Sequence, residues 1–343
     1  MRCKKCLLTD KFPKIKFNEE GICNYCLHEE KSKKLAITDA ERLLNEIDEE
    51  LNKVKGKNRY DALVLYSGGK DSTYTLKLAV EKYGLNVLAY TYDNGYLSEQ
   101  ARVNILNIVE ELNCDHIFFK PKRKAFIELS KIVSSNEIYP AQNKTRISDI
   151  CQACINTINI NAVELALEKD IPFIIAGFTS GQIPKNSVVY EFKYNTIKEF
   201  RKNQDEKILQ LGGNELDKFL SLPKKFESYE YFPRYINLLT VQELSENDII
   251  EECKKIGWVK PKDVDGSSSN CKLNSFSNLL FLYKYGFHPY EQELSTLIRK
   301  NLLTREEGLA KLNDFGKEEE IFRIGESLGY DSKFIKEIIL ITK

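Results

Sequence analysis

Residues 60–76 read Tyr60-Asp-Ala-Leu-Val-Leu-Tyr-Ser-Gly-Gly-Lys-Asp-Ser-Thr-Tyr-Thr-Leu76 and predict a strand, a tight loop and a helix in succession. The apolar run over 61–66 has the length of a buried strand, and apolar residues resume with helical spacing after Ser72. Between them, two adjacent glycines let the backbone approach an anion closely, and the first amides of the helix are free to bind it. This stretch therefore predicts a phosphate-binding loop at the end of a first strand.

The loop does not match the common phosphate-binding pattern G-x-x-x-x-G-K-[ST], because only one residue precedes the glycine pair and Asp71 follows the lysine. The string Ser-Gly-Gly-Lys-Asp-Ser instead resembles the PP-loop ATP pyrophosphatase family, which is adenine nucleotide alpha hydrolase-like. Members of that family cleave ATP between the α and β phosphates and adenylate a substrate oxygen. The resemblance implies a Rossmann-like domain and AMP transfer followed by attack of a nucleophile.

The resemblance also implies roles for the loop residues. They would hold the β and γ phosphates of ATP, with Lys70 supplying a point charge and Asp71 entering the shell of Mg²⁺ as catalytic residues. The alternative is a plain serine-glycine turn between a strand and a helix. The residues concerned are Ser67, Gly68, Gly69, Lys70, Asp71 and Ser72.

Two further apolar runs end in polar residues. The run over 85–93 has the character of a buried parallel strand, and the resemblance implies that Tyr92 and Asp93 at its end contact the adenosine. The run over 171–182 places Gly177 and Thr179 at the carboxyl end of a strand, where open α/β sheets bind ligands. Each could equally be a plain junction between a strand and a loop.

The alternation of strand and helix patterns predicts an α/β fold with a doubly wound parallel sheet. Strands are expected at 61–66, 86–92, 115–119 and 171–176, and helices near 72–82, 98–112, 123–133 and 154–168. The expected divisions of the chain are a zinc-binding knuckle at 1–34, a linking helix at 35–58 that begins at Thr38, a PP-loop ATP-binding domain at 59–182, an insertion or lid at 183–244, and a helical C-terminal region at 245–343. The aromatic-rich stretch after Ile183 could also be a connector that fills a local core.

Composition points to a cytoplasmic protein without membrane segments. Lys plus Arg and Asp plus Glu each number 51 among the 343 residues, so no global basic field recruits nucleic acid. No apolar run reaches 18 residues, and the amino terminus lacks the apolar stretch of a signal peptide. The nine cysteines then indicate metal ligation, because disulfides are rare in a reducing cytosol.

The first cysteine set predicts a zinc site. Cys3-x-x-Cys6 and Cys23-x-x-Cys26 are separated by 16 residues, a spacing that four-cysteine zinc sites use. Thiolate coordination can fold a short polar segment that buries almost no apolar core. The alternative is four unrelated thiols.

The second set consists of Cys151, Cys154 and Cys271. The first two open a helical segment, where the helix dipole stabilises thiolates, and Cys271 lies in a loop of small polar residues. The set resembles that of PP-loop tRNA thiolases, which hold a [4Fe-4S] cluster by three irons. The resemblance implies a fourth iron open to sulfide. The alternatives are a catalytic persulfide pair, or a redox C-x-x-C with an unrelated Cys271.

A second resemblance involves both ends of the chain. Residues 16–26 and 294–307 are similar to the opening knuckle and the carboxyl end of the N-acetyl sugar amidotransferases of surface-glycan synthesis, a PP-loop group. This resemblance implies ammonia as the nucleophile. A partner glutaminase would supply it, because the chain lacks the N-terminal catalytic cysteine of a glutaminase.

The expected function is ATP-dependent sulfur transfer, in which a substrate carbonyl oxygen is adenylated and then replaced by sulfur. Expected partners are a tRNA or small-molecule acceptor, a sulfur donor protein or sulfide, and a second copy of the chain in a homodimer. The tRNA assignment is weakened because no cysteine follows Cys271, whereas the thiolases usually carry a second knuckle there. The alternatives are the amidotransferase and a zinc-knuckle protein that senses ATP without turnover.

Overall fold

The computed structural model describes residues 1–140, 143–183, 188–191, 193–212, 214–242 and 244–341. Within these ranges the side chains at 30–39, 143, 200, 203, 214, 215, 218 and 341 are not described.

A six-stranded sheet forms the centre of the protein, in the order β3-β2-β1-β4-β6-β5. All neighbouring pairs are parallel except β5 with β6 at one edge. This confirms the predicted doubly wound α/β class. The strands are β1 (Ala62–Leu65), β2 (Val87–Tyr92), β3 (Asp115–Phe119), β4 (Phe173–Ala176), β5 (Val189–Glu191) and β6 (Arg234–Asn237).

Helices cover both faces of the sheet. Alternate residues of β1 point to opposite faces, so that Leu63 packs in one apolar core and Val64 in the other. The first core includes residues of α4 (Arg123–Ser135) and α5 (Asp149–Glu168), and the second includes residues of α2 (Lys70–Lys77) and α3 (Glu99–Glu111). Within the described residues, α5 alone is long and apolar enough to cross a membrane, and it packs on β1, β4 and α4 as a core helix does.

The segment 183–244 contributes two strands that the sequence did not predict. It contains β5, α6 (Tyr194–Gly212), α7 (Asn214–Leu220) and β6. The last of these pairs with β4, from Phe173 beside Arg234 to Ala176 beside Asn237. The segment thus adds two strands to the sheet. Its role as a lid over the site stays a prediction.

The predicted start of the linking helix at Thr38 is wrong. The helix α1 runs from Asn24 to Val54 without a break and so begins inside the N-terminal knuckle. The charged run at 29–34 consists of Glu, Lys and Ser, and glutamate and lysine are good helix formers, so nothing in the backbone interrupts the helix there.

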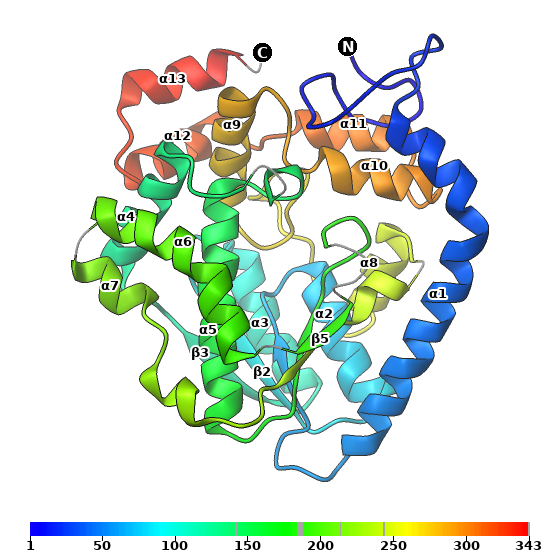
Figure 1. The fold of residues 1–343 in the computed structure, drawn as a ribbon, viewed down its shortest axis with the longest axis vertical. Helices are drawn as coiled ribbons and strands as arrows, with labels where there is room; N and C mark the ends of the chain where they lie inside the picture. Colours follow the sequence, from blue (N-terminus) through cyan, green and yellow to red (C-terminus); the bar gives the residue numbers. More distant parts are fainter. Residues whose placement is uncertain (141–142, 184–187, 192, 213, 243, 342–343) are drawn as a thin grey trace.

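The C-terminal region is helical, as predicted. It contains α8 (Glu246–Lys254), α9 (Leu273–Tyr285), α10 (Glu291–Arg299), α11 (Arg305–Asn313), α12 (Glu318–Ser327) and α13 (Ser332–Ile341). Figure 1 shows the N-terminal knuckle beside α10 and α11, with α1 descending along one side of the molecule. The two ends of the chain therefore pack together.

Candidate functional site

The candidate nucleotide site lies where the strand order reverses. Both β2 and β4 pair with β1, so the connections after β1 and β4 leave from neighbouring carboxyl ends. A Cβ atom on Gly177 would lie 2.7 Å from Thr75 Oγ1 and 2.9 Å from the Asp71 carbonyl oxygen. Gly177 thus follows β4, at the carboxyl end of a strand as predicted, and lies directly against the start of α2. Its contact with a nucleotide stays a prediction.

The loop at 67–72 has the strand-to-helix form that its sequence predicts. Gly68 has a φ of 76°, and a Cβ there would overlap the Ala101 carbonyl and lie 2.8 Å from Ile105 Cγ1. The Ser67 and Ser72 hydroxyls are 3.0 Å apart at the mouth of the loop. Because α2 begins at Lys70, its first amides point into this loop, which is the arrangement that binds anions.

Lys70 is held between two carboxylates. Its Nζ lies 2.7 Å from Asp71 Oδ2 and 3.9 Å from Glu246 Oε1. Burial alone would lower the pKa of Lys70, but the charges of Asp71 and Glu246 raise it above its ordinary value. The site therefore keeps a permanent positive charge beside the amides of the loop.

Glu293 is a site residue that the sequence analysis missed. It is 8% exposed and lines a cavity of about 60 Å³ together with Lys70 and Asp71. Gln182 Nε2 donates to its Oε1 at 3.1 Å, and the Thr179 hydroxyl lies 3.4 Å from the same oxygen. Burial raises the pKa of Glu293 to about 7. Glu293 lies in the C-terminal region, and nothing in the local sequence indicated that α10 reaches the nucleotide loop.

Two carboxylate oxygens at this cavity fit a divalent cation. Asp71 Oδ1 and Glu293 Oε2 are buried and have no hydrogen-bond partner within the described part of the chain. Unsatisfied carboxylate oxygens are hard ligands of the kind that Mg²⁺ takes alongside phosphates. A cavity of this volume holds an ion with a few waters, but not a whole nucleotide.

The predicted adenosine contacts lie at the carboxyl end of β2. Asp93 is fully buried, and Arg102 Nη2 donates to both its carboxylate oxygens at 3.1 and 2.9 Å. The Gly95 amide donates to it at 2.8 Å. Tyr92 is buried in the core beside them. The carboxylate of Asp93 thus stabilises its own loop, and contacts of both residues with adenosine stay a prediction.

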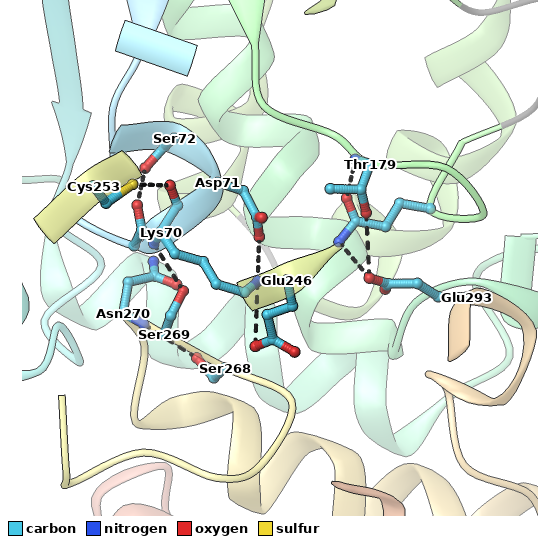
Figure 2. Close-up of polar contacts among 12 residues, drawn as sticks. Lys70, Asp71, Ser72, Thr179, Glu246, Cys253, Ser268, Ser269, Asn270 and Glu293 are labelled. Carbon is cyan, nitrogen blue, oxygen red and sulfur yellow. Dashed lines mark hydrogen bonds and ion pairs between the residues drawn. The ribbon is translucent and has the colours of Figure 1, made fainter. Parts of the chain in front are cut away.

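A serine-rich loop at 265–271 connects the nucleotide loop with the cysteines. The Lys70 amide donates to Ser269 Oγ at 3.1 Å, and a Cβ on Gly69 would lie 2.7 Å from that hydroxyl. Figure 2 shows Ser268, Ser269 and Asn270 next to the start of α2. The sequence predicted a loop of small polar residues here but gave no contact for Ser269. Cys271 follows two residues later, so the two candidate centres share this loop.

Cys151, Cys154 and Cys271 come together in the structure. Asn94 Nδ2 lies 3.6 Å from both Cys154 Sγ and Cys271 Sγ. Cys151 Sγ is 3.6 Å from Asn274 Oδ1, on the helix that follows Cys271. The prediction that these three cysteines meet is thus consistent with the geometry.

The expected stabilisation of thiolates by the α5 dipole is not seen. Burial raises the pKa of Cys151, Cys154 and Cys271, that of Cys271 to about 12, with neighbouring cysteines adding to the shift in Cys154 and Cys271. Cys154 is buried and Cys151 and Cys271 are half-buried, and this desolvation favours the uncharged thiol over the thiolate. Without a bound positive group, these residues are thiols.

The N-terminal cysteines form a tight cluster. Cys3, Cys6, Cys23 and Cys26 are buried, and their sulfurs all lie within 4.8 Å of one another. Cys3 and Cys26 are 4.0 Å apart, and Cys6 and Cys23 are 3.7 Å apart. Sulfurs held about 2.3 Å from a tetrahedral zinc would be separated by about 3.8 Å, so the cluster fits a single zinc ion.

The knuckle is supported by the last helices. The Leu7 amide donates to Ser295 Oγ at 3.1 Å, and the Thr9 amide donates to Glu291 Oε2 at 3.0 Å. The Arg305 guanidinium donates to the carbonyls of Cys3 and Cys6 at 3.3 Å. The knuckle therefore packs on α10 and on the start of α11, through Glu291, Ser295 and Arg305.

Comparison with known proteins gives distant relatives. No protein-family model matches the chain. An uncharacterized protein of Methanocaldococcus jannaschii is 25% identical, over 94% of this chain and 96% of its own length.

The structure is similar to several solved structures at 16% identity. A U34-tRNA thiolase from Methanococcus maripaludis, solved with its [4Fe-4S] cluster, matches 88% of this chain and 86% of its own with a TM-score of 0.35. An NMN synthetase from Francisella tularensis matches 55% and 74% with a TM-score of 0.31. A predicted tRNA methyltransferase subunit from Methanocaldococcus jannaschii matches 67% and 91% with a TM-score of 0.32.

Proposed function

We propose that the protein is a PP-loop enzyme that binds ATP with Mg²⁺, adenylates a carbonyl oxygen of its acceptor and replaces that oxygen with sulfur. The observation that carries the proposal is the shared loop at 265–271. It contacts the Lys70 amide through Ser269 and brings Cys271 to Cys151 and Cys154. An activated acceptor at the nucleotide loop would therefore lie near the cysteines.

The first step is transfer of AMP. The acceptor's carbonyl oxygen attacks the α-phosphorus of ATP, the bond to the bridging oxygen breaks, and pyrophosphate leaves. The α2 amides and the Lys70 ammonium stabilise the charge that develops on pyrophosphate, because they are fixed in place before the reaction. Bound Mg²⁺ would neutralise further phosphate charge there.

The second step replaces oxygen with sulfur. A sulfur nucleophile attacks the activated carbon, and AMP departs with the original oxygen. Cys151, Cys154 and Cys271 fit a cluster rather than a single ion. Two of these cysteines come from one C-x-x-C and the third from the loop at 265–271, and Asn94 Nδ2 lies 3.6 Å from both Cys154 Sγ and Cys271 Sγ. A [4Fe-4S] cluster with three protein thiolates supplies an open position for sulfide.

We place the protein in the cytoplasm, a reducing compartment in which the seven cysteines assigned to zinc and to the cluster would stay available as ligands. The acceptor is a tRNA or a small metabolite, and the sulfur comes from sulfide or a donor protein.

The test is anaerobic reconstitution followed by metal analysis. We expect one zinc and about four irons per chain. Cys271→Ser should lose most of the iron and keep the zinc, whereas Cys114→Ser, a half-buried cysteine outside both sets, should keep both. Iron retained in full by Cys271→Ser would contradict the cluster.

A second candidate is an amidotransferase that uses the same adenylate with ammonia from a partner glutaminase. The contacts of Ser295 and Arg305 with Leu7 and Cys3 favour it, because they join the segment 294–307 to the knuckle to which residues 16–26 also belong. Zinc without iron, together with AMP release that depends on ammonium rather than sulfide, would select this function.

A further inference from the structure

The helix α10 connects the zinc knuckle with the nucleotide loop. Glu291 accepts from the Thr9 amide of the knuckle, and Ser295 accepts from the Leu7 amide. Glu293, between them in sequence, lines the cavity beside Lys70 and Asp71. Figure 2 shows its carboxyl group pointing towards the side chains of Lys70 and Glu246. One short helix therefore has one face on the knuckle and another on the candidate ATP site.

The carboxylate of Glu293 is only partly satisfied. Its Oε1 accepts from Gln182 and lies near the Thr179 hydroxyl, which fixes the orientation of the group. Its Oε2 is buried without a partner in the described residues, as is Asp71 Oδ1. A buried carboxylate oxygen with no partner is costly to keep in a folded protein. Such a pair at one small cavity indicates that both oxygens bind something absent from the free protein.

The missing partner must be positive. The candidate phosphate groups bring further negative charge to Lys70, whose ammonium already serves Asp71 and Glu246. Glu293 at this place would repel a triphosphate unless a cation lay between them. Mg²⁺ is commonly bound by one or two carboxylates together with phosphate oxygens and water.

We infer that Glu293 and Asp71 together ligate the divalent cation that accompanies ATP, so that α10, seated on the zinc knuckle, completes the ATP–metal site. This inference rests on the proposed function. It assigns a task to the knuckle, which holds the helix that carries one metal ligand. It also accounts for the two unpartnered oxygens.

The test measures binding of α,β-methylene-ATP, a non-cleavable analogue, to the full chain by calorimetry, in EDTA and in Mg²⁺. Wild type should bind more tightly in Mg²⁺. Glu293→Gln, which keeps the shape and the contact with Gln182, should lose about tenfold or more of this enhancement. In EDTA the variant should bind as well as wild type or better, because a repulsive charge has gone.

The control is Glu320→Gln, which makes the same change at a carboxylate on α12 that pairs with Arg323 and takes no part in the cavity or in the seating of α10. It should keep the Mg²⁺ enhancement. Mn²⁺ bound with the analogue gives a direct spectroscopic readout by electron paramagnetic resonance, and Glu293→Asp, which keeps the charge, should retain part of the effect.

Three outcomes are distinct. Loss of the Mg²⁺ enhancement in Glu293→Gln alone supports the inference. Full enhancement in that variant overturns it and leaves the proposed function standing. Failure of wild type to bind the analogue under any condition overturns the proposed function and the inference with it.

Discussion

At the scale of single residues, the nucleotide loop depends on a position with no side chain. Gly68 combines a positive φ with a close approach to Ala101, and Trp258 Nε1 donates to its carbonyl at 2.9 Å. The glycine pair was evident from the sequence. The neighbours that constrain Gly68 were not evident from the sequence, because Ala101 and Trp258 are distant from it in the chain.

Gly68→Ala should therefore destabilise the protein more than Gly56→Ala. Both glycines have a positive φ, but a Cβ at Gly56 meets nothing within 4 Å. We expect about 1–2 kcal/mol at Gly56 from the backbone alone, and on the order of 2 kcal/mol more at Gly68 from overlap. Urea unfolding of the two variants measures the difference, and equal losses would show that the loop has room for a side chain.

Glu293 should make stability depend on pH in the absence of ATP. Burial raises its pKa from 4.5 to about 7 in the folded protein, so the folded state binds an extra proton between these values. The Glu293 carboxyl therefore contributes its full stabilisation below the unfolded pKa of 4.5, and this contribution is lost as the pH rises through about 7. The difference in free energy of unfolding between Glu293→Gln and wild type should therefore favour the variant by up to about 3 kcal/mol more at pH 8 than at pH 4. Urea unfolding in EDTA at both pH values measures this, and a gain equal at both would contradict the shift.

At the scale of elements, the sequence predicted the strands that have a clear apolar pattern of their own. The four predicted strands carry apolar, β-branched or aromatic runs that read clearly. The strand β6 reads Arg-Tyr-Ile-Asn, with polar residues at both ends, whereas the equally short β1 and β4 are apolar throughout. Its place in the sheet depends on pairing with β4, a tertiary contact that a local pattern does not contain.

The packing of the knuckle on α10 and α11 also depends on contacts between residues that are far apart in the sequence. The C-x-x-C pairs revealed the four cysteines, but nothing local indicated that Arg305 and α10 would support them. Leu7 packs with Leu294 and Leu312, so helices far away in the sequence complete the core on which the knuckle lies.

Arg305→Ala should loosen the knuckle. The variant removes the donors to the carbonyls of Cys3 and Cys6, so we expect faster zinc loss to a chelator and faster amide exchange over residues 2–9. Arg323→Ala removes a largely exposed arginine that pairs with Glu320 and serves as the control. Equal zinc release from both variants would show that Arg305 is dispensable.

At the scale of the whole molecule, three features meet on one side of the sheet. The nucleotide loop and the cysteine set share the loop at 265–271, and the knuckle reaches the nucleotide loop through α10. The sequence identified each motif separately. Their connection required the fold, because Lys70, Ser269 and Glu293 come from three distant parts of the chain.

The most direct test of the central claim is to identify the products made from ATP. The reconstituted protein would be incubated with ATP labelled at the α-phosphate, Mg²⁺, sulfide or ammonium, and either bulk tRNA or a nucleotide-linked N-acetyl sugar as acceptor. The account predicts equal amounts of AMP and pyrophosphate in a mixture that contains a true acceptor. Formation of ADP and orthophosphate instead would contradict it.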